Sequence, residues 1–279
     1  MKDMENTPVL VLGGKGKTGR RVVERLKNRG REAIVASRST NPGFDWNDRE
    51  TWAENLQGIG AVYITYQPDL AVSGAVDNIR HFTEMALQAG VRRLVLLSGR
   101  GEEEAQRAEQ VLQDSGADWT IVRAGWFAQN FSENFLIDGV LSGQVVLPAF
   151  KTKEPFVDAD DIADVVVEAL MDDRHIGELY EVTGGRLISF GEAVGEIAAA
   201  AGRDIQLIEV SHEEYKDLLG AQQLPDDLAW LIMYLFTTIM DGRNEHLNDG
   251  VQRALGREPK DFTEYARDVA ATGAWAPQN

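Results

Sequence analysis

The sequence contains no cysteine among its 279 residues. Without thiols the chain forms neither disulfides nor a thiolate nucleophile, and it cannot ligate zinc or an iron–sulfur cluster through sulfur. Histidine is also rare. The residues His81, His175, His212 and His246 are scattered without the spacing of metal ligands, so we expect no metal site.

Basic residues are scarce relative to acidic ones. The chain has 28 lysines and arginines against 45 aspartates and glutamates, a formal net charge of −17. Nucleic-acid affinity depends largely on basic side chains, so the composition argues against a nucleic-acid partner. An acidic, solvated surface explains the charge, and attraction of a cationic small molecule is the alternative explanation.

Long apolar runs are missing as well. The longest uncharged one, residues 228–240, is shorter than the roughly 20 residues that span a bilayer. The first residues contain no apolar stretch typical of a signal peptide. We therefore expect a cytoplasmic protein that has a small-molecule substrate and no membrane partner, with a homodimer left open.

Short apolar segments alternate with amphipathic segments in the first half of the chain. The apolar segments are residues 9–12, 33–37, 61–65, 93–98 and 119–122. This alternation predicts an α/β fold, a doubly wound parallel sheet with helices on both faces. A short third strand is expected to end at Asp45 and Trp46. After residue 123 the pattern becomes mostly helical, and the two parts of the chain are expected to interleave.

A glycine-rich segment follows the first predicted strand and opens the first helix. Its glycines lie at G-x-x-G-x-x-G spacing, with one extra glycine. In this context the glycines let the backbone approach a pyrophosphate, and the helix N-terminus attracts the anion. The predicted dinucleotide-binding loop comprises Gly13, Gly14, Lys15, Gly16, Lys17, Thr18 and Gly19.

The end of the second strand indicates which dinucleotide binds. A site for NAD has an acidic residue there for the ribose hydroxyls, but this chain has no carboxylate until Asp45. Arg38 is instead suited to the 2′-phosphate of NADP(H), with Ser37 and Ser39 as hydroxyl donors. A solvated surface arginine is the alternative. Asp45 and Trp46 are expected to lie against the adenine.

Several segments resemble the NmrA-like family of atypical short-chain dehydrogenases over nearly the whole chain. They include LGGKGKTGRRVVERL, RRLVLLSGRG, WTIVRAGWFAQNFSE and FVDADDIADVVVEAL. The subgroups nearest to these segments are quinone reductases, triphenylmethane-dye reductases and the iminium reductases of ergot-alkaloid biosynthesis. The resemblance implies NADP(H) and a Rossmann domain, residues 1–125 with about 155–175. It also implies a smaller, mostly helical α+β substrate-binding domain, about 126–154 and 176–279.

The resemblance also implies further site residues. Thr65, Tyr66, Gln67 and Pro68 are expected to line the nicotinamide ribose, and Ser98 and Gly99 to lie under the nicotinamide. Trp126, Phe127 and Asn130 are expected to lie between the cofactor and substrate pockets and to line the substrate pocket. Apart from the resemblance, an apolar stripe near helical spacing is expected to cover that pocket and to include Tyr234; its residues are Trp230, Met233, Tyr234, Phe236 and Met240. Ordinary core packing explains Trp126 and Phe127 equally well, and core or a dimer surface explains the apolar stripe that contains Tyr234.

The Tyr-x-x-x-Lys pair that delivers a proton in the larger dehydrogenase superfamily is missing. No lysine lies four residues after Tyr63, Tyr66, Tyr180, Tyr215, Tyr234 or Tyr265. In the segment where the pair would fall, Glu104, Gln106 and Glu109 are expected to form a solvated helix face.

Two hypotheses follow from the missing pair. In the first, an NADPH-dependent enzyme transfers hydride to a hydrophobic iminium, dye or quinone acceptor by orientation alone, with no essential acid–base side chain. Ser98 then has at most a hydrogen-bonding role, and a quinone takes its proton from solvent. In the second, the chain is a non-catalytic NADP(H)-sensing regulator that acts through protein partners.

Overall fold

The structure is a computed structural model that describes residues 7–133, 135–148 and 151–276. The chain divides into two compact units. The sheet unit comprises Met1–Ala124, Ala159–Val182 and Asp249–Arg257, and the helical unit comprises Gly125–Asp158, Thr183–Asn248 and Glu258–Asn279.

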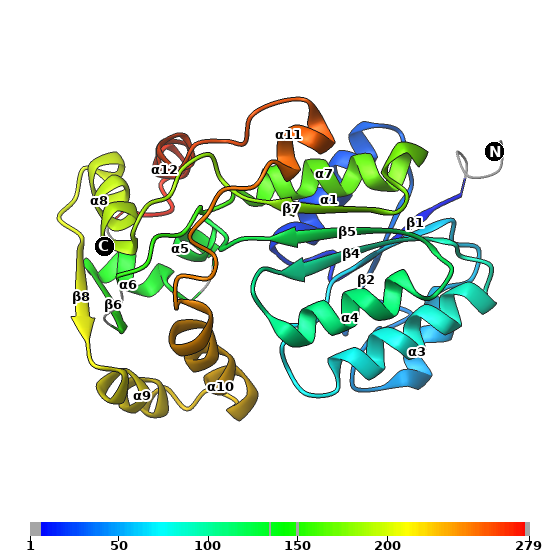
Figure 1. Cartoon of the computed structure of the whole chain (residues 1–279), viewed down its shortest axis with the longest axis horizontal. Helices are drawn as coiled ribbons and strands as arrows, with labels where there is room; N and C mark the ends of the chain where they lie inside the picture. Colours follow the sequence, from blue (N-terminus) through cyan, green and yellow to red (C-terminus); the bar gives the residue numbers. More distant parts are fainter. Residues whose placement is uncertain (1–6, 134, 149–150, 277–279) are drawn as a thin grey trace. The chain divides into compact units, whose positions relative to one another are not determined.

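Six parallel strands form the centre of the sheet unit (Figure 1). They are β1 (Val9–Leu12), β2 (Ala33–Ala36), β3 (Ala61–Ile64), β4 (Arg93–Gly99), β5 (Asp118–Ala124) and β7 (Glu178–Val182). Their order is β2-β1-β3-β4-β5-β7, so the chain changes direction across the sheet at β1. Strands β1 and β3 are wholly buried, as expected for strands covered on both faces. The predicted doubly wound α/β fold is confirmed.

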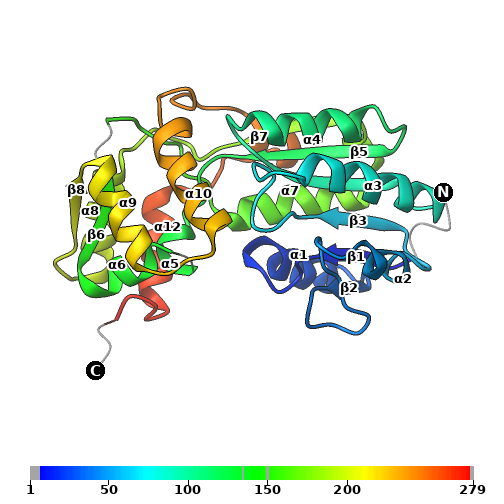
Figure 2. The same ribbon diagram turned by 90° about the horizontal axis from the view of Figure 1, so that it is seen from below.

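Helices cover both faces of this sheet (Figures 1 and 2). Helices α1 (Lys17–Asn28) and α7 (Ala159–Met171) pack together on one face, and α3 (Ala75–Gln88) and α4 (Glu103–Gln113) pack together on the other. The sheet unit also contains η2 (Arg49–Thr51), α2 (Trp52–Asn55), η3 (Asp173–His175) and α11 (Gly250–Leu255). Among the described residues, no helix is both long and apolar enough to cross a membrane.

A row of ion pairs joins α1 to α7. Arg21 and Arg25 on α1 and Arg29, the residue that follows its last turn, recur every four residues, the spacing at which helical side chains lie above one another. Their partners are Asp160 (3.1 Å from Arg21 and 2.9 Å from Arg25), Asp164 (2.5 Å from Arg25) and Glu168 (with Arg29). We call this row the arginine ladder.

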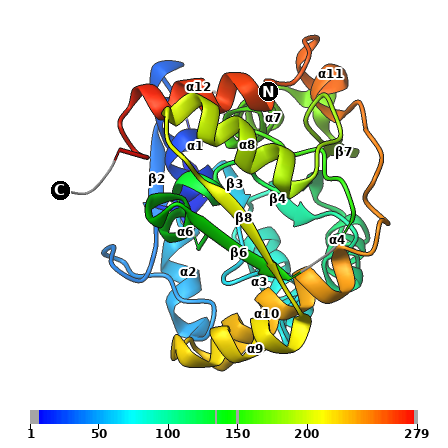
Figure 3. The same ribbon diagram turned by 90° about the vertical axis from the view of Figure 1, so that its left-hand side faces the viewer.

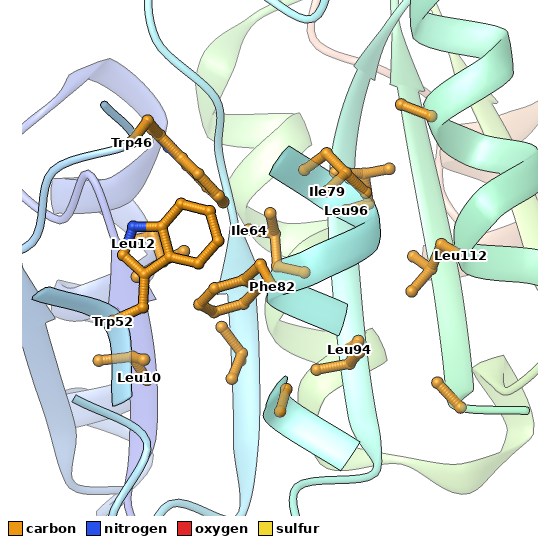
Figure 4. Packing of buried hydrophobic residues seen from close by; sticks show 14 of the residues in the cluster. Leu10, Leu12, Trp46, Trp52, Ile64, Ile79, Phe82, Leu94, Leu96 and Leu112 are labelled. Atoms are coloured by element: carbon orange, nitrogen blue, oxygen red, sulfur yellow. The ribbon is translucent and has the colours of Figure 1, made fainter. Parts of the chain in front are cut away.

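The prediction of a short strand that ends at Asp45 and Trp46 is wrong, because only an isolated bridge between Asp45 and Asp48 forms there. The segment turns its rings inward instead, and Trp46 packs against Trp52 and Phe82 (Figure 4). The indole N–H of Trp46 donates to the carbonyl of Thr65 at 2.9 Å, and that of Trp52 donates to the carbonyl of Asp45 at 2.7 Å. These bonds satisfy the buried indoles in place of a strand pairing.

The helical unit has its own core around aromatic rings. Figure 3 shows its strands and helices. Strands β6 (Gln144–Pro148) and β8 (Gln206–Val210) form a parallel pair. The helices are α5 (Asn130–Glu133), α6 (Ile137–Ser142), α8 (Phe190–Ala201), α9 (His212–Ala221), α10 (Asp226–Tyr234), the π-helical turn η4 (Leu235–Ile239) and α12 (Phe262–Ala271).

Two segments expected in the substrate-binding domain lie in the sheet unit. Strand β7 pairs with β5 from Thr120↔Glu178 to Ala124↔Val182 and so forms an edge of the sheet. Helix α11 packs on β7 so closely that a Cβ on Gly250 would collide with the backbone carbonyl of Glu181. The segment Ala159–Val182 runs past the boundary expected near residue 175, and the segment Asp249–Arg257 is separated in sequence from the rest of the sheet unit.

Candidate cofactor and active site

The glycines of the loop between β1 and α1 lie where neighbouring atoms leave little room for a side chain. Gly13 has φ +63°, and a Cβ there would lie 2.5 Å from Thr65 Oγ1. A Cβ on Gly19 would collide with the carbonyl oxygen of Gly13. Helix α1 begins after Gly16 with no side-chain cap and no acidic residue in its first turn. Its first N–H groups and positive dipole end therefore fit an anion such as the predicted pyrophosphate.

Basic and hydroxyl side chains gather at the end of β2. Lys15 Nζ in the loop donates to Ser39 Oγ at 2.8 Å, and Ser39 Oγ lies 3.2 Å from Ser37 Oγ. Arg38 is exposed, and no acidic side chain of the described chain forms an ion pair with it. Two cations beside two hydroxyl groups fit a phosphate better than a ribose diol, which calls for a carboxylate acceptor.

Of the four residues after β3, the first two have side chains held by contacts and the last two have exposed side chains. Thr65 Oγ1 donates to the carbonyl of Leu12 at 2.9 Å. The Tyr66 ring packs on Trp46 with centroids 4.8 Å apart, and its hydroxyl accepts from Asn78 at 2.8 Å. The next two residues, Gln67 and Pro68, are exposed. Asp45 and Trp46 are the predicted neighbours of the adenine. Trp46 is buried, and the Asp45 carboxylate accepts a hydrogen bond from the Asn47 N–H at 3.0 Å.

The expectation that Glu109 is solvated is wrong. Glu109 is 2% exposed, and Ser98 Oγ donates to its carboxylate at 2.6 Å. Arg123 on β5 also forms an ion pair with Glu109, and this hydrogen bond raises the pKa of Arg123. Arg123 reaches Glu181 at 3.3 Å, and Arg100 reaches Glu181 at 2.6 Å. The Ser98 hydroxyl is therefore hydrogen-bonded to a buried carboxylate that belongs to a network of alternating charges.

The neighbouring helix positions behave differently from Glu109. Gln106 is exposed as expected, and Glu104 forms a surface ion pair with Arg107.

Two further carboxyl groups lie beyond the carboxyl ends of β3 and β4. Asp69 follows the 65–68 segment, and Glu102 lies between β4 and α4. The two side chains are within hydrogen-bonding reach of each other. Burial raises the pKa of Asp69, and burial together with Asp69 raises the pKa of Glu102 well above its ordinary value.

The predicted substrate residues belong to the helical unit. Trp126 is 9% exposed, and its ring lies 5.3 Å from Phe190 and 5.2 Å from Phe236 between centroids. Its indole nitrogen is buried and has no hydrogen-bond partner among the described residues. Phe127 forms an isolated bridge with Val157.

Asn130 and Tyr234 lie on different helices of the helical unit. Asn130 begins α5, and Tyr234 ends α10. The Tyr234 ring stacks on Trp230 with centroids 5.1 Å apart and planes 8° apart, and Trp230 is 49% exposed. The apolar stripe therefore divides, because Phe236 and Met240 are buried in the core of the helical unit.

Sequence comparison identifies the class of protein. The profile of the NAD(P)H-binding family matches residues 13–173, more than half of the chain. The chain therefore belongs to this NAD(P)H-binding family, and the predicted resemblance to the NmrA-like atypical short-chain dehydrogenases is confirmed. Among curated relatives, agroclavine dehydrogenase from Claviceps fusiformis is 28% identical over 281 residues, 93% of this chain and 96% of the relative.

Solved structures share the fold. Citrobacter sp. triphenylmethane reductase complexed with NADP(H) matches with a TM-score of 0.79 and 16% identity, covering 94% of this chain and 99% of that one. The NADPH-dependent quinone oxidoreductase of Escherichia coli, complexed with NADPH, matches with a TM-score of 0.77 and 20% identity, covering 94% and 99%. At these identities the likeness shows the common architecture.

Sequence reasoning missed Asp69 and Glu102, although a signal was present for Glu102. Glu102, Ala105, Glu109 and Leu112 are spaced three, four and three residues apart, which places them on one helical face. Two of the four are apolar, so this face is the buried one. Acids on such a face are candidates for a site. Among the described residues, no group of acidic or histidine side chains is arranged to hold a metal ion.

Proposed function

We propose that the chain is an NADPH-dependent oxidoreductase that reduces a small hydrophobic acceptor, an iminium, a cationic dye or a quinone. One observation carries the preference for NADPH. The end of β2 presents Arg38 without an acidic partner among the described residues, next to Lys15, Ser37 and Ser39, and has no carboxylate of its own.

The residues of the sheet unit fit this cofactor. Gly13–Gly19 and the start of α1 would hold the pyrophosphate, and Arg38 with Lys15 would hold the 2′-phosphate. When bound, the reduced nicotinamide supplies a hydride. Gly99 and the exposed Gln67 and Pro68, at the carboxyl ends of β4 and β3, would line the nicotinamide end of the site.

Substrate binding is assigned to aromatic residues of the helical unit. Trp126, Phe127 and Tyr234 supply apolar surface, and the indole N–H of Trp126 is a donor without a partner among the described residues. Asn130 adds a side-chain amide. The names of the relatives, a clavine dehydrogenase, a dye reductase and a quinone oxidoreductase, support acceptors of this kind. The main contribution to catalysis is then orientation of the acceptor.

Tyrosine does not supply a proton in this proposal. Tyr63, on β3, is completely buried and its hydroxyl donates to Thr18 Oγ1 at 2.9 Å. Burial raises the pKa of Tyr63, and the hydroxyl of Tyr66 is held by Asn78.

Calorimetric binding of NADPH, NADP⁺, NADH and NAD⁺ tests the proposal. We expect the phosphorylated dinucleotides to bind more tightly, and Arg38→Ala to weaken NADPH binding about 10- to 100-fold, the loss of one charged hydrogen-bonding partner. NADH binding is expected to remain unchanged. Arg80→Ala, at an exposed position on α3, is the control.

Two results would contradict the proposal. Equal losses for NADPH and NADH would mean that Arg38 supports the loop rather than binding a phosphate. Selective binding of NADPH without reduction of any acceptor of the three classes would favour the regulator.

A further inference from the structure

A pair of carboxyl groups lies where β3 and β4 end. The Asp69 carboxylate accepts from the Ala71 N–H at 2.9 Å, which holds it at the start of the loop that leads to α3. Glu102 is the residue that precedes α4, and it is 5% exposed. The side chains come from separate loops and lie within hydrogen-bonding reach of each other. A hydrogen bond between two carboxyl groups requires a proton on one of them.

The surroundings of this pair do not compensate two negative charges. Neither Asp69 nor Glu102 forms an ion pair with a described lysine or arginine, and Glu102 Oε2 is buried without a hydrogen-bond partner among the described residues. The other acid close to Glu102 is Glu109, whose charge is already balanced by Arg123.

The start of α4 favours a charged carboxylate at Glu102 through the helix dipole. Burial and the charge of Asp69 outweigh this effect, and the pKa of Glu102 is raised well above its ordinary value. Both pKa shifts act in the direction that favours a proton on one of the two carboxyl groups.

The position of the pair is the third observation. A Cβ on Gly99 would lie 2.5 Å from Cδ and from Oε1 of Glu102, so the carboxyl group occupies the space beside Gly99 where a side chain would be. Gly99 ends β4, and open α/β sheets bind their ligands beyond the carboxyl ends of their strands. Ser98, the residue before it, directs its hydroxyl to Glu109.

We infer that Asp69 and Glu102 are a proton-donating pair for the reduction of a neutral acceptor such as a quinone. This inference rests on the proposed function, and it replaces the expectation that the proton comes from solvent. The quinone gains a hydride with its electron pair from NADPH, which is oxidised to NADP⁺, and a proton from the pair, giving the hydroquinone. The pair is left as two carboxylates and regains one proton from water. A cationic dye needs the hydride alone.

Infrared spectroscopy of the full chain without cofactor tests whether the pair holds a proton. At pH 7 we expect the carbonyl band of a protonated carboxylic acid, shifted in heavy water, in the wild type and in the control Glu103→Gln, whose side chain is exposed. The band is expected to be missing in Glu102→Gln. A wild-type spectrum without it would overturn the inference.

Single-turnover reduction of a naphthoquinone and of a triarylmethyl cation dye tests the donor role. We expect Glu102→Gln to slow quinone reduction about 100-fold, as for loss of a general acid, and to change dye reduction less than about threefold. NADPH affinity is expected to stay unchanged. Asp69→Asn removes the other carboxyl group of the pair and is the variant to use if Glu102→Gln does not fold.

The outcomes separate the two proposals. Equal slowing with both acceptors, or no slowing with the quinone, overturns the donor role while the reductase activity stands. A wild-type chain that binds NADPH but reduces neither probe overturns the proposed function and the donor role with it.

Discussion

The sheet unit holds carboxylates in two opposite environments. In the arginine ladder Asp160, Asp164 and Glu168 of α7 each meet an arginine of the ladder, and Asp164 is also bound by Arg257 at 2.6 Å. Asp69 and Glu102 have no such partner among the described residues, and the pKa of each is raised. The comparison teaches that the acids of this very acidic chain are not interchangeable: some have their charge balanced by an arginine, and two buried acids without such a partner have a raised pKa.

Removing the cation from a buried pair is expected to have the largest effect. Arg123→Ala leaves Glu109 buried without its cation, which should lower the free energy of unfolding by about 3 kcal/mol. Urea denaturation measures this loss. The control Arg107→Ala breaks a surface pair with Glu104 and should cost less than about 0.5 kcal/mol. Similar losses for both variants would remove the distinction between buried and exposed pairs.

Glu102→Gln should raise the free energy of unfolding at high pH, whereas Arg123→Ala lowers it. A raised pKa means that folded Glu102 holds a proton that the unfolded chain has released, so its unfavourable contribution grows as pH rises above its ordinary value of 4.5. Glutamine removes this contribution. Urea denaturation at pH 8 should show a gain of about 1 to 2 kcal/mol, the cost of an unsatisfied buried group. The gain should vanish near pH 4, and a gain independent of pH would argue against a titrating pair.

Loosening the ladder should have the smallest effect. Asp164→Asn keeps the shape of the side chain and removes a charge shared by Arg25 and Arg257, for an expected loss of about 1 kcal/mol. The loss should shrink in high salt, because the pairs are partly exposed. Glu24→Gln, at an exposed position on α1, is the control. A salt-independent loss would mean that Asp164 acts through packing rather than charge.

Features that depend on neighbouring residues were predictable from the sequence. The alternation of buried strands with helices and the glycine loop at Gly13–Gly19 are local patterns, and both lie where they were predicted. The contact of Lys15 with Ser39, and the alignment of Arg21, Arg25 and Arg29 with α7, join segments far apart in the chain. Such contacts depend on how the elements pack, which periodicity alone does not give.

Glu109 was misinterpreted for a related reason. Its charge suggested solvent, while its spacing from Ala105 and Leu112 placed it on the buried face of α4. The spacing was the better guide, because a buried charge is stable when an arginine from another element meets it. That arginine, Arg123, comes from β5 and is not adjacent in sequence.

The order of segments along the chain has a consequence for synthesis. Strand β7 and helix α11 complete the sheet unit, yet residues 125–158 and 183–248, which lie in the helical unit, are interposed before each of them. A ribosome must therefore deliver the chain as far as residue 257 before the sheet unit is complete. The edge of β5 is unpaired until β7, which ends at Val182, has been synthesised. A fragment cut at residue 173, where the family match ends, lacks both segments and therefore part of the sheet unit.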